Sequence, residues 1–160
     1  YKDSFDKRRK KDNIAEQKAE EFYGNIDCFF FRYGLDLLES SITKKQFCMI
    51  PQMIRNTPDY IVIQKNVWLV EVKGGKDFLR LKIEDLDSYA KWNNICPVLF
   101  FIYDFASRRK IQVQYTVLKS LVNTNDYPLE RYPDNNKQYY KIPMSEFNLK
   151  NGISSIMCEE

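Results

Sequence analysis

Three charged residues, Asp59, Glu71 and Lys73, lie in or beside stretches of sequence that are otherwise apolar. Asp59 is followed by Tyr60-Ile61-Val62-Ile63, and the other two lie within residues 68–75. Runs of β-branched, aromatic and aliphatic residues such as these are typical of buried strands. Carboxylates seldom lie in buried strands without a partner, because removing a charge from water is costly. The pattern therefore indicates a site that joins two carboxylates and a lysine.

The two apolar runs predict a hairpin whose turn is Gln64-Lys65-Asn66. With a three-residue loop, Ile63 faces Val67, and counting back along both strands places Asp59 opposite Glu71. Cross-strand neighbours lie ~5 Å apart at Cβ. Because side chains alternate along a strand, Glu71 shares its face with the lysine two residues later, so we expect all three charged groups in one cluster.

Two like charges that face each other destabilise a sheet, and a hard divalent cation would remove that cost. Mg²⁺ prefers carboxylate oxygens and waters in octahedral geometry, and a lysine beside the cation can orient or help to deprotonate a bound water. The alternative is an edge hairpin whose Asp, Lys and Glu side chains form a ladder that faces solvent.

Pro58-Asp59, followed on the next strand by Glu71-Val72-Lys73, resembles the signature of the PD-(D/E)XK, or restriction-endonuclease-like, nuclease superfamily. The resemblance covers roughly residues 14–104. It implies that Asp59, Glu71 and the backbone carbonyl of Val72 hold Mg²⁺, with Mn²⁺ as a substitute. It also implies that Lys73 orients the attacking water and steadies charge on the scissile phosphate.

In this family an acidic residue of the first helix often completes the metal site. The resemblance implies Glu16 for that role, with Glu20 one turn further along as a reserve. The alternative for either residue is an ordinary carboxylate on the exposed side of a helix.

The remaining patterns occur in the order that the family requires. Periodicity predicts helices over residues 12–23 and 79–93, and buried strands over residues 28–33 and 98–103. The predicted fold class is therefore α/β, with a restriction-endonuclease-like αβββαβ core and a central mixed sheet flanked by helices.

We expect a single nuclease domain over residues 1–160. It comprises a basic N-terminal segment over residues 1–11, a catalytic core over residues 12–104 and a C-terminal extension of that core over residues 105–160. Within the extension, residues 111–117 alternate like an added strand, residues 128–136 predict a loop, and residues 145–147 begin a short element.

Several basic residues, one glycine and one tyrosine are candidates for contacting nucleic acid: Lys7, Arg8, Arg9, Lys10, Lys11, Gly74, Lys82, Tyr89, Arg108 and Arg109. The basic residues could contact phosphates, and a glycine lets a phosphate backbone approach closely. The alternatives are a solvated basic tail over residues 7–11 and glycines that only end the strand.

Asp85-Leu86-Asp87-Ser88-Tyr89 resembles the Gln-x-x-x-Tyr motif of the RecB-like branch, with aspartate in place of glutamine. Residues four apart share a helix face, so Asp85 and Tyr89 could both face the site, with Lys82 nearby. The alternative is that Lys82 and Asp85 are solvated while the Tyr89 ring packs on the core.

Composition excludes several mechanisms. The chain has no histidine, which removes imidazole-based triads and histidine-metal nucleases. It also lacks a G-x-x-x-x-G-K-[ST] loop, so no nucleotide cofactor is expected, and no apolar run is long enough for a membrane span. The four cysteines show no metal spacing and predict reduced thiols in the cytoplasm, or in the host cytoplasm for a viral protein.

The sequence therefore predicts a Mg²⁺-dependent DNA nuclease that hydrolyses phosphodiester bonds as an endonuclease on structured or branched DNA. Its small size and basic segments resemble Holliday-junction-resolvase-like or phage-type nucleases. Because resolvases act as dimers, the resemblance implies a homodimer as a candidate state. The alternatives are an exonuclease of the same fold, or a non-catalytic nucleic-acid-binding or assembly module that retains the fold.

Overall fold

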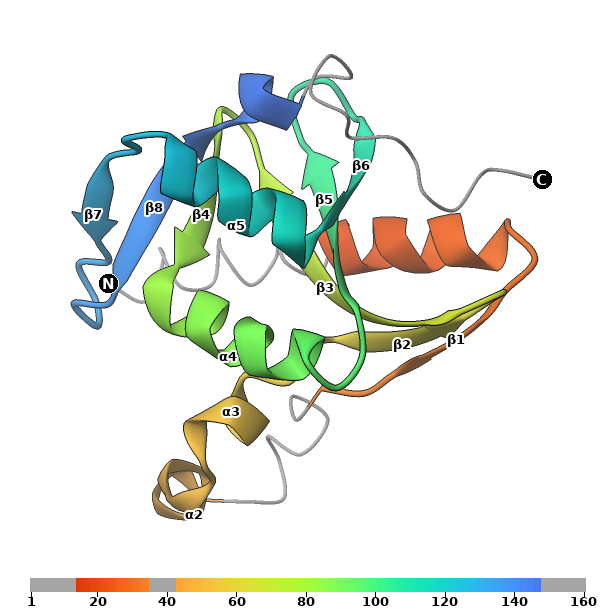
Figure 1. Cartoon of the computed structure of the whole chain (residues 1–160), viewed down its shortest axis with the longest axis horizontal. Helices are drawn as coiled ribbons and strands as arrows, with labels where there is room; N and C mark the ends of the chain where they lie inside the picture. Colours follow the sequence, from red (N-terminus) through yellow and green to blue (C-terminus); the bar gives the residue numbers. More distant parts are fainter. Residues whose placement is uncertain (1–13, 35–42, 148–160) are drawn as a thin grey trace.

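The computed structural model describes residues 14–34 and 43–147 of the 160-residue chain. Residues 14–24 are helical, and the elements that follow are shown in Figure 1. In chain order they are β1 (Phe29–Arg32), α2 (Lys44–Met49), α3 (Gln52–Arg55), β2 (Tyr60–Ile63), β3 (Val67–Gly75), β4 (Phe78–Lys82), α4 (Ile83–Asn93), β5 (Val98–Asp104), β6 (Lys110–Gln114), α5 (Tyr115–Thr124), β7 (Leu129–Arg131), β8 (Gln138–Pro143) and the 3₁₀ helix η2 (Met144–Phe147).

Five strands form the main sheet in the order β1-β2-β3-β5-β6. The pair β3 and β5 is parallel and the other neighbours are antiparallel, so the sheet is mixed. Every residue of β5 is buried, as expected of a central strand covered on both faces. The predicted fold class, α/β with a mixed sheet flanked by helices, is confirmed.

Helices cover both faces of this sheet. The helix over residues 14–24 packs Ala15, Ala19 and Tyr23 against β2, β3 and β5 on one face. On the other face, α4 and α5 bury a second cluster that includes Leu86 and Leu118 (Figure 1). None of the helices in the described residues is long and apolar enough to cross a membrane.

A second sheet of three strands, in the order β4-β8-β7, lies beside the main sheet. Its inner face buries Leu79, Leu81 and Ile142 in the same cluster as α4 and α5. This sheet was not predicted, because residues 79–82 were assigned to a helix. That assignment is wrong: the residues of β4 alternate between exposed and buried up to its last position, the period of a strand, and the helix begins only at Ile83.

The C-terminal extension differs from the expectation at two further places. The added strand β6 ends at Gln114 and α5 begins at Tyr115, so residues 115–117 are helical, and the predicted loop over residues 128–136 contains the short strand β7. The short element expected near Ser145 is present as η2. Because β6 pairs with β5, the extension completes the edge of the main sheet.

The strand predicted over residues 28–33 is present as β1 but is not buried. It forms the edge of the main sheet, and its residues alternate between exposed and partly buried. Phe30 packs against Tyr23 of the first helix, whereas Phe29 and Phe31 point to the opposite face and are exposed. An edge strand covered by a helix on one face alone accounts for this pattern.

Candidate functional site

The predicted hairpin register is confirmed, because Ile63 pairs with Val67 and Tyr60 pairs with Val70. Continued by one residue, this register places Asp59, which directly precedes β2, opposite Glu71. The Oδ2 atom of Asp59 accepts a hydrogen bond from the Val72 amide at 2.7 Å.

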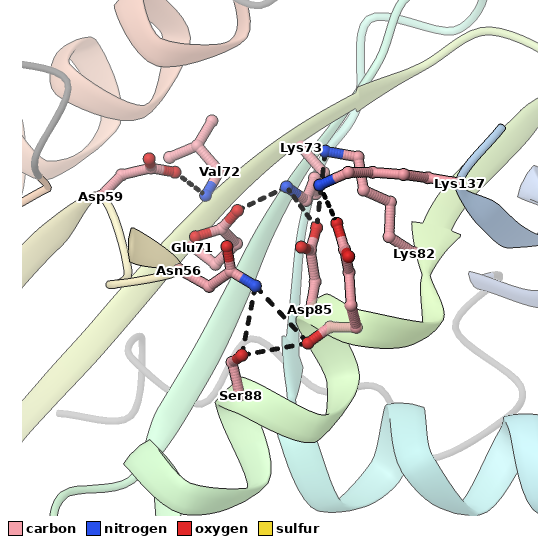
Figure 2. A network of polar contacts seen from close by, with 10 residues as sticks. Asn56, Asp59, Glu71, Val72, Lys73, Lys82, Asp85, Ser88 and Lys137 are labelled. Atoms are coloured by element: carbon pink, nitrogen blue, oxygen red, sulfur yellow. Dashed lines mark hydrogen bonds and ion pairs between the residues drawn. The ribbon is translucent and has the colours of Figure 1, made fainter. Parts of the chain in front are cut away.

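Glu71 is 4% exposed and projects from the middle of β3. Its Oε1 atom accepts a hydrogen bond from Lys73 Nζ at 2.5 Å (Figure 2). Its Oε2 atom is buried and has no hydrogen-bond partner within the described part of the chain. Burial is the main cause of the raised pKa of the nearby Tyr89 hydroxyl, and the charge of Glu71 and a contact with its side chain add to it. A buried carboxylate oxygen without a donor is costly unless a cation neutralises it.

The pKa of Asp59 is raised well above its usual range. Burial is the main cause, and the negative charges of Glu71 and Glu16 add to it, whereas Lys73 and the Val72 amide lower the pKa. The two carboxylates therefore act on each other as like charges.

Lys73 lies between two acidic side chains. Besides Glu71, its Nζ atom is 3.9 Å from Asp85 Oδ2. Burial would lower the pKa of Lys73, but the carboxylates of Glu71, Asp85 and Asp59 outweigh burial and raise it. The lysine is consequently held in its charged form within the cluster.

Asp85 also belongs to the cluster, a role that the sequence alone did not decide. It lies in the first turn of α4, is 5% exposed, and is also 4.0 Å from Lys82 Nζ. The alternative in which Asp85 is solvated is therefore wrong. The spacing between Asp85 and Tyr89 indicated that Asp85 faces inward, because residues four apart share one face of a helix and Tyr89 packs on the core.

A polar network fixes α4 beside the carboxylates. Asn56 Nδ2 donates to Ser88 Oγ at 3.1 Å, and Ser88 Oγ donates to the Glu84 carbonyl at 3.0 Å (Figure 2). Lys137, from the segment before β8, forms an ion pair with the Glu84 side chain. These contacts hold the start of α4, and with it Asp85, against the segment that leads to Asp59.

The two first-helix candidates differ in their surroundings. Glu16 Oε2 pairs with Arg32 at 2.7 Å, and the charge of Glu16 contributes to the raised pKa of Asp59. Glu20 Oε1 instead accepts a hydrogen bond from the Tyr60 hydroxyl at 2.7 Å. Glu16 is thus near enough for its charge to act on Asp59.

The candidates for nucleic-acid contact are dispersed. Lys82 adjoins the cluster, but Tyr89 is 3% exposed and packs edge-on against Phe100, so its ring faces the core. Arg109 pairs with Asp104 at 3.2 Å in the turn between β5 and β6, and Arg108 is exposed in the same turn. The run Lys7–Lys11 lies outside the described residues.

Gly74 is closely surrounded by protein atoms. A Cβ atom at this position would lie 2.5 Å from the Phe105 ring and 3.3 Å from Ala15 Cβ. Gly74 therefore has the structural role that the sequence left open, which is close packing at the end of the strand. A phosphate contact at Gly74 stays a prediction.

The donor chemistry of the cluster fits a hard divalent cation. Asp59 and Glu71 supply carboxylate oxygens from neighbouring strands, and Glu71 Oε2 is buried without a partner. Within residues 14–34 and 43–147, however, no three Asp, Glu or Cys side chains are close enough together to hold a metal ion. Two carboxylates alone could hold such a cation only with water completing its coordination, as is usual for Mg²⁺.

The fold and the site together define a mixed α/β protein with an acidic pair and a lysine at the centre of its sheet. No protein-family model matches the sequence, and no curated protein matches it. Among solved structures, a nuclease from a fusselovirus is similar to 84% of this chain and 78% of its own, with 12% identity and a TM-score of 0.44. What the site can do chemically follows from its own residues.

Proposed function

We propose that this protein is a metal-dependent nuclease with a restriction-endonuclease-like core, which hydrolyses phosphodiester bonds in structured or branched DNA. The observation that carries the proposal is the juxtaposition of Asp59 and the buried Glu71 with Lys73, in which one oxygen of Glu71 lacks a donor. Burying two carboxylates and leaving one oxygen without a donor costs stability, and a bound ligand would offset that cost.

In this proposal Asp59, Glu71 and the carbonyl of Val72 would hold Mg²⁺ or Mn²⁺, with Glu16 nearby. When bound, such a cation polarises the phosphate and lowers the pKa of a bound water. Lys73 offers a fixed positive charge to the phosphate and orients the water. Asp85 acts through Lys73: its Oδ2 atom lies 3.9 Å from the ammonium group and helps to position it beside Glu71.

The second candidate is a non-catalytic nucleic-acid-binding module. Two observations favour it. Glu71 is already paired with Lys73, and Glu16 is paired with Arg32. In addition, no cluster of three acidic groups is present among the described residues. Such internal pairing would leave fewer oxygens for a catalytic metal.

The purified protein should be incubated with closed circular, linear and four-way-junction DNA in Mg²⁺, Mn²⁺ or EDTA. Nicking of the circle indicates an endonuclease, resolution of the junction indicates structure selectivity, and shortening of linear DNA alone indicates an exonuclease. Binding without cleavage in any metal supports the module instead.

Three variants test the assigned residues, namely Asp59→Asn, Glu71→Gln and Lys73→Met. Each should reduce cleavage by at least about 100-fold, since each removes a charge from the proposed catalytic cluster. Asp87→Asn is the matched control, because Asp87 is exposed on α4. Cleavage by all three variants at the control rate contradicts the assignment.

A further inference from the structure

The outer face of the β4-β8-β7 sheet is basic. Strand alternation places Phe78, Arg80 and Lys82 of β4 on this side, because Leu79 and Leu81 point into the core. The register pairs Arg80 with Lys141 and Lys82 with Tyr139, and Glu130 of β7 lies across from Tyr139. We call this surface the basic face: Phe78, Arg80, Lys82, Glu130, Tyr139 and Lys141, together with Tyr132 directly after β7.

Aromatic rings hold the cations of the basic face in place. The guanidinium of Arg80 lies 5.6 Å from the centroid of the Tyr139 ring, and Lys82 Nζ lies 6.0 Å from that of Tyr132. The two tyrosine rings are 4.4 Å apart. Cation–π contacts of this kind fix the direction of long side chains while their charged ends still meet solvent.

A similar contact holds Lys141, whose Nζ atom is 4.3 Å from the centroid of the Phe78 ring. Tyr139, at the centre of the face, is 5% exposed. A base could not stack on a ring that is covered in this way. The basic face therefore offers positive charge to a ligand but no stacking platform at its centre.

The basic face is continuous with the catalytic cluster. Lys82 and Lys73 approach the same Asp85 oxygen, at 4.0 and 3.9 Å. Burial raises the pKa of Tyr132, and the positive charges of Lys73 and Arg80 act on it in the opposite direction. Tyr132 is therefore near enough to both Lys73 and Arg80 for their charges to act on it.

Charge complementarity decides what this surface would bind. The basic face carries three cations, and its one carboxylate, Glu130, pairs with Lys141 at 2.9 Å. We propose that the basic face binds the phosphodiester backbone of the nucleic acid on one side of the cleavage site, without reading its sequence. The location of that cleavage site rests on the proposed function.

Salt dependence of binding tests the proposal without requiring cleavage. Binding of a fluorescein-labelled linear DNA duplex in EDTA should be measured across a KCl series for the wild type and for Arg80→Gln/Lys141→Gln. If both cations contact phosphates, the slope of log affinity against log salt should fall by about 1 to 2 units. The control is Lys65→Gln/Lys91→Gln, which removes two exposed lysines from the hairpin loop and the last turn of α4 and should leave the slope unchanged.

Glu130→Gln provides a test of the opposite sign. It retains a hydrogen-bond acceptor for Tyr139 and frees Lys141, so affinity should increase at every salt concentration. Because this variant removes no packing, it keeps the proposal testable if the double variant fails to fold. Equal slopes for the double variant and its control, unchanged affinity of Glu130→Gln, or no binding by the wild type at low salt would each overturn the proposal.

Cleavage assays on the same proteins separate the two conclusions. A wild type that binds with the expected slopes but cleaves nothing in Mg²⁺ or Mn²⁺ refutes the nuclease while the basic face stands. A wild type that cleaves DNA, with equal slopes for all variants, refutes the basic face alone.

Discussion

Asp59, directly before β2, lies opposite Glu71 on β3, and the charge of Lys73 acts on both carboxylates. Burial and the charge of Glu71 raise the pKa of Asp59. A carboxyl group whose pKa is higher in the folded state favours folding below its unfolded pKa, and this contribution is lost as the pH rises through the folded pKa. Above its unfolded pKa, the Asp59 carboxyl group therefore lowers the stability of the protein unless a bound cation offsets this cost.

Asp59→Asn should accordingly raise the melting temperature at pH 7 in EDTA. The difference from the wild type should shrink as the pH falls toward about 4, because below the ordinary aspartate pKa the carboxyl group is neutral in both the folded and the unfolded state. Added Mg²⁺ should stabilise the wild type and leave the variant unchanged, because binding to the folded state alone raises stability. Thermal denaturation at several pH values, with Asp87→Asn as control, measures both effects. A variant less stable than the wild type at every pH contradicts this account.

Lys73 neutralises two buried carboxylates, so its removal should cost stability as well as activity. Lys73→Met leaves Glu71 and Asp85 without their shared cation. We expect a loss of about 2–3 kcal/mol in the free energy of unfolding, below the range for fully buried pairs because the Lys73 side chain is 24% exposed. Urea denaturation in EDTA measures the change, and Lys65→Met in the exposed hairpin loop is the control. Equal stabilities of the two variants would show that the pairs contribute little.

At the scale of elements, the end of β3 is joined to β4 by a tight approach of the backbone. A Cβ atom at Gly75 would lie 2.8 Å from the carbonyl oxygen of Phe78 and 2.9 Å from Met144 Sδ. At Gly74 the obstacle is instead the side chain of Phe105, which can rotate. The two glycines thus close β3 and let it lead into the second sheet directly after Lys73.

Gly75→Ala should therefore destabilise the protein by about 2–3 kcal/mol, and Gly74→Ala by about 1 kcal/mol, since only the second clash can be relieved by a side-chain movement. Chemical denaturation of both variants measures the difference. The reverse order of stabilities would show that the backbone near Phe78 shifts more easily than the Phe105 ring.

At the scale of the whole molecule, positive charge is distributed over separate surfaces although the net charge is only +3. The described part of the chain contributes the basic face and the turn with Arg108 and Arg109. The sequence adds the run Lys7–Lys11, which lies outside the described residues. Binding by several such surfaces would be strongly salt-dependent.

If the five residues Lys7–Lys11 contact phosphates, replacing all of them by alanine should lower the salt slope of log affinity by up to about 4 to 5 units. Fluorescence anisotropy across a KCl series in EDTA measures the slope. Parallel slopes for the variant and the wild type would identify the run as a solvated tail.

The sequence by itself determined the hairpin, its register, and the order of the first helix, β1, β2, β3, α4 and β5, but not α2, α3 or β4. These features depend on local patterns: two apolar runs, a three-residue loop and the period of two that places Glu71 and Lys73 on one face. Because the chemistry of Asp59, Glu71 and Lys73 follows from that register, the centre of the candidate site was accessible from the sequence.

Only the tertiary structure decided what surrounds that centre. Lys82 belongs to a strand because it pairs with Tyr139, more than fifty positions later, and no local pattern contains that partner. The same assembly buries Asp85 beside Lys73 and pairs Glu16 with Arg32. Contacts between residues far apart in sequence outweigh local helix propensity, so the second sheet, its basic face and the fourth charged member of the cluster emerge only when the chain is folded.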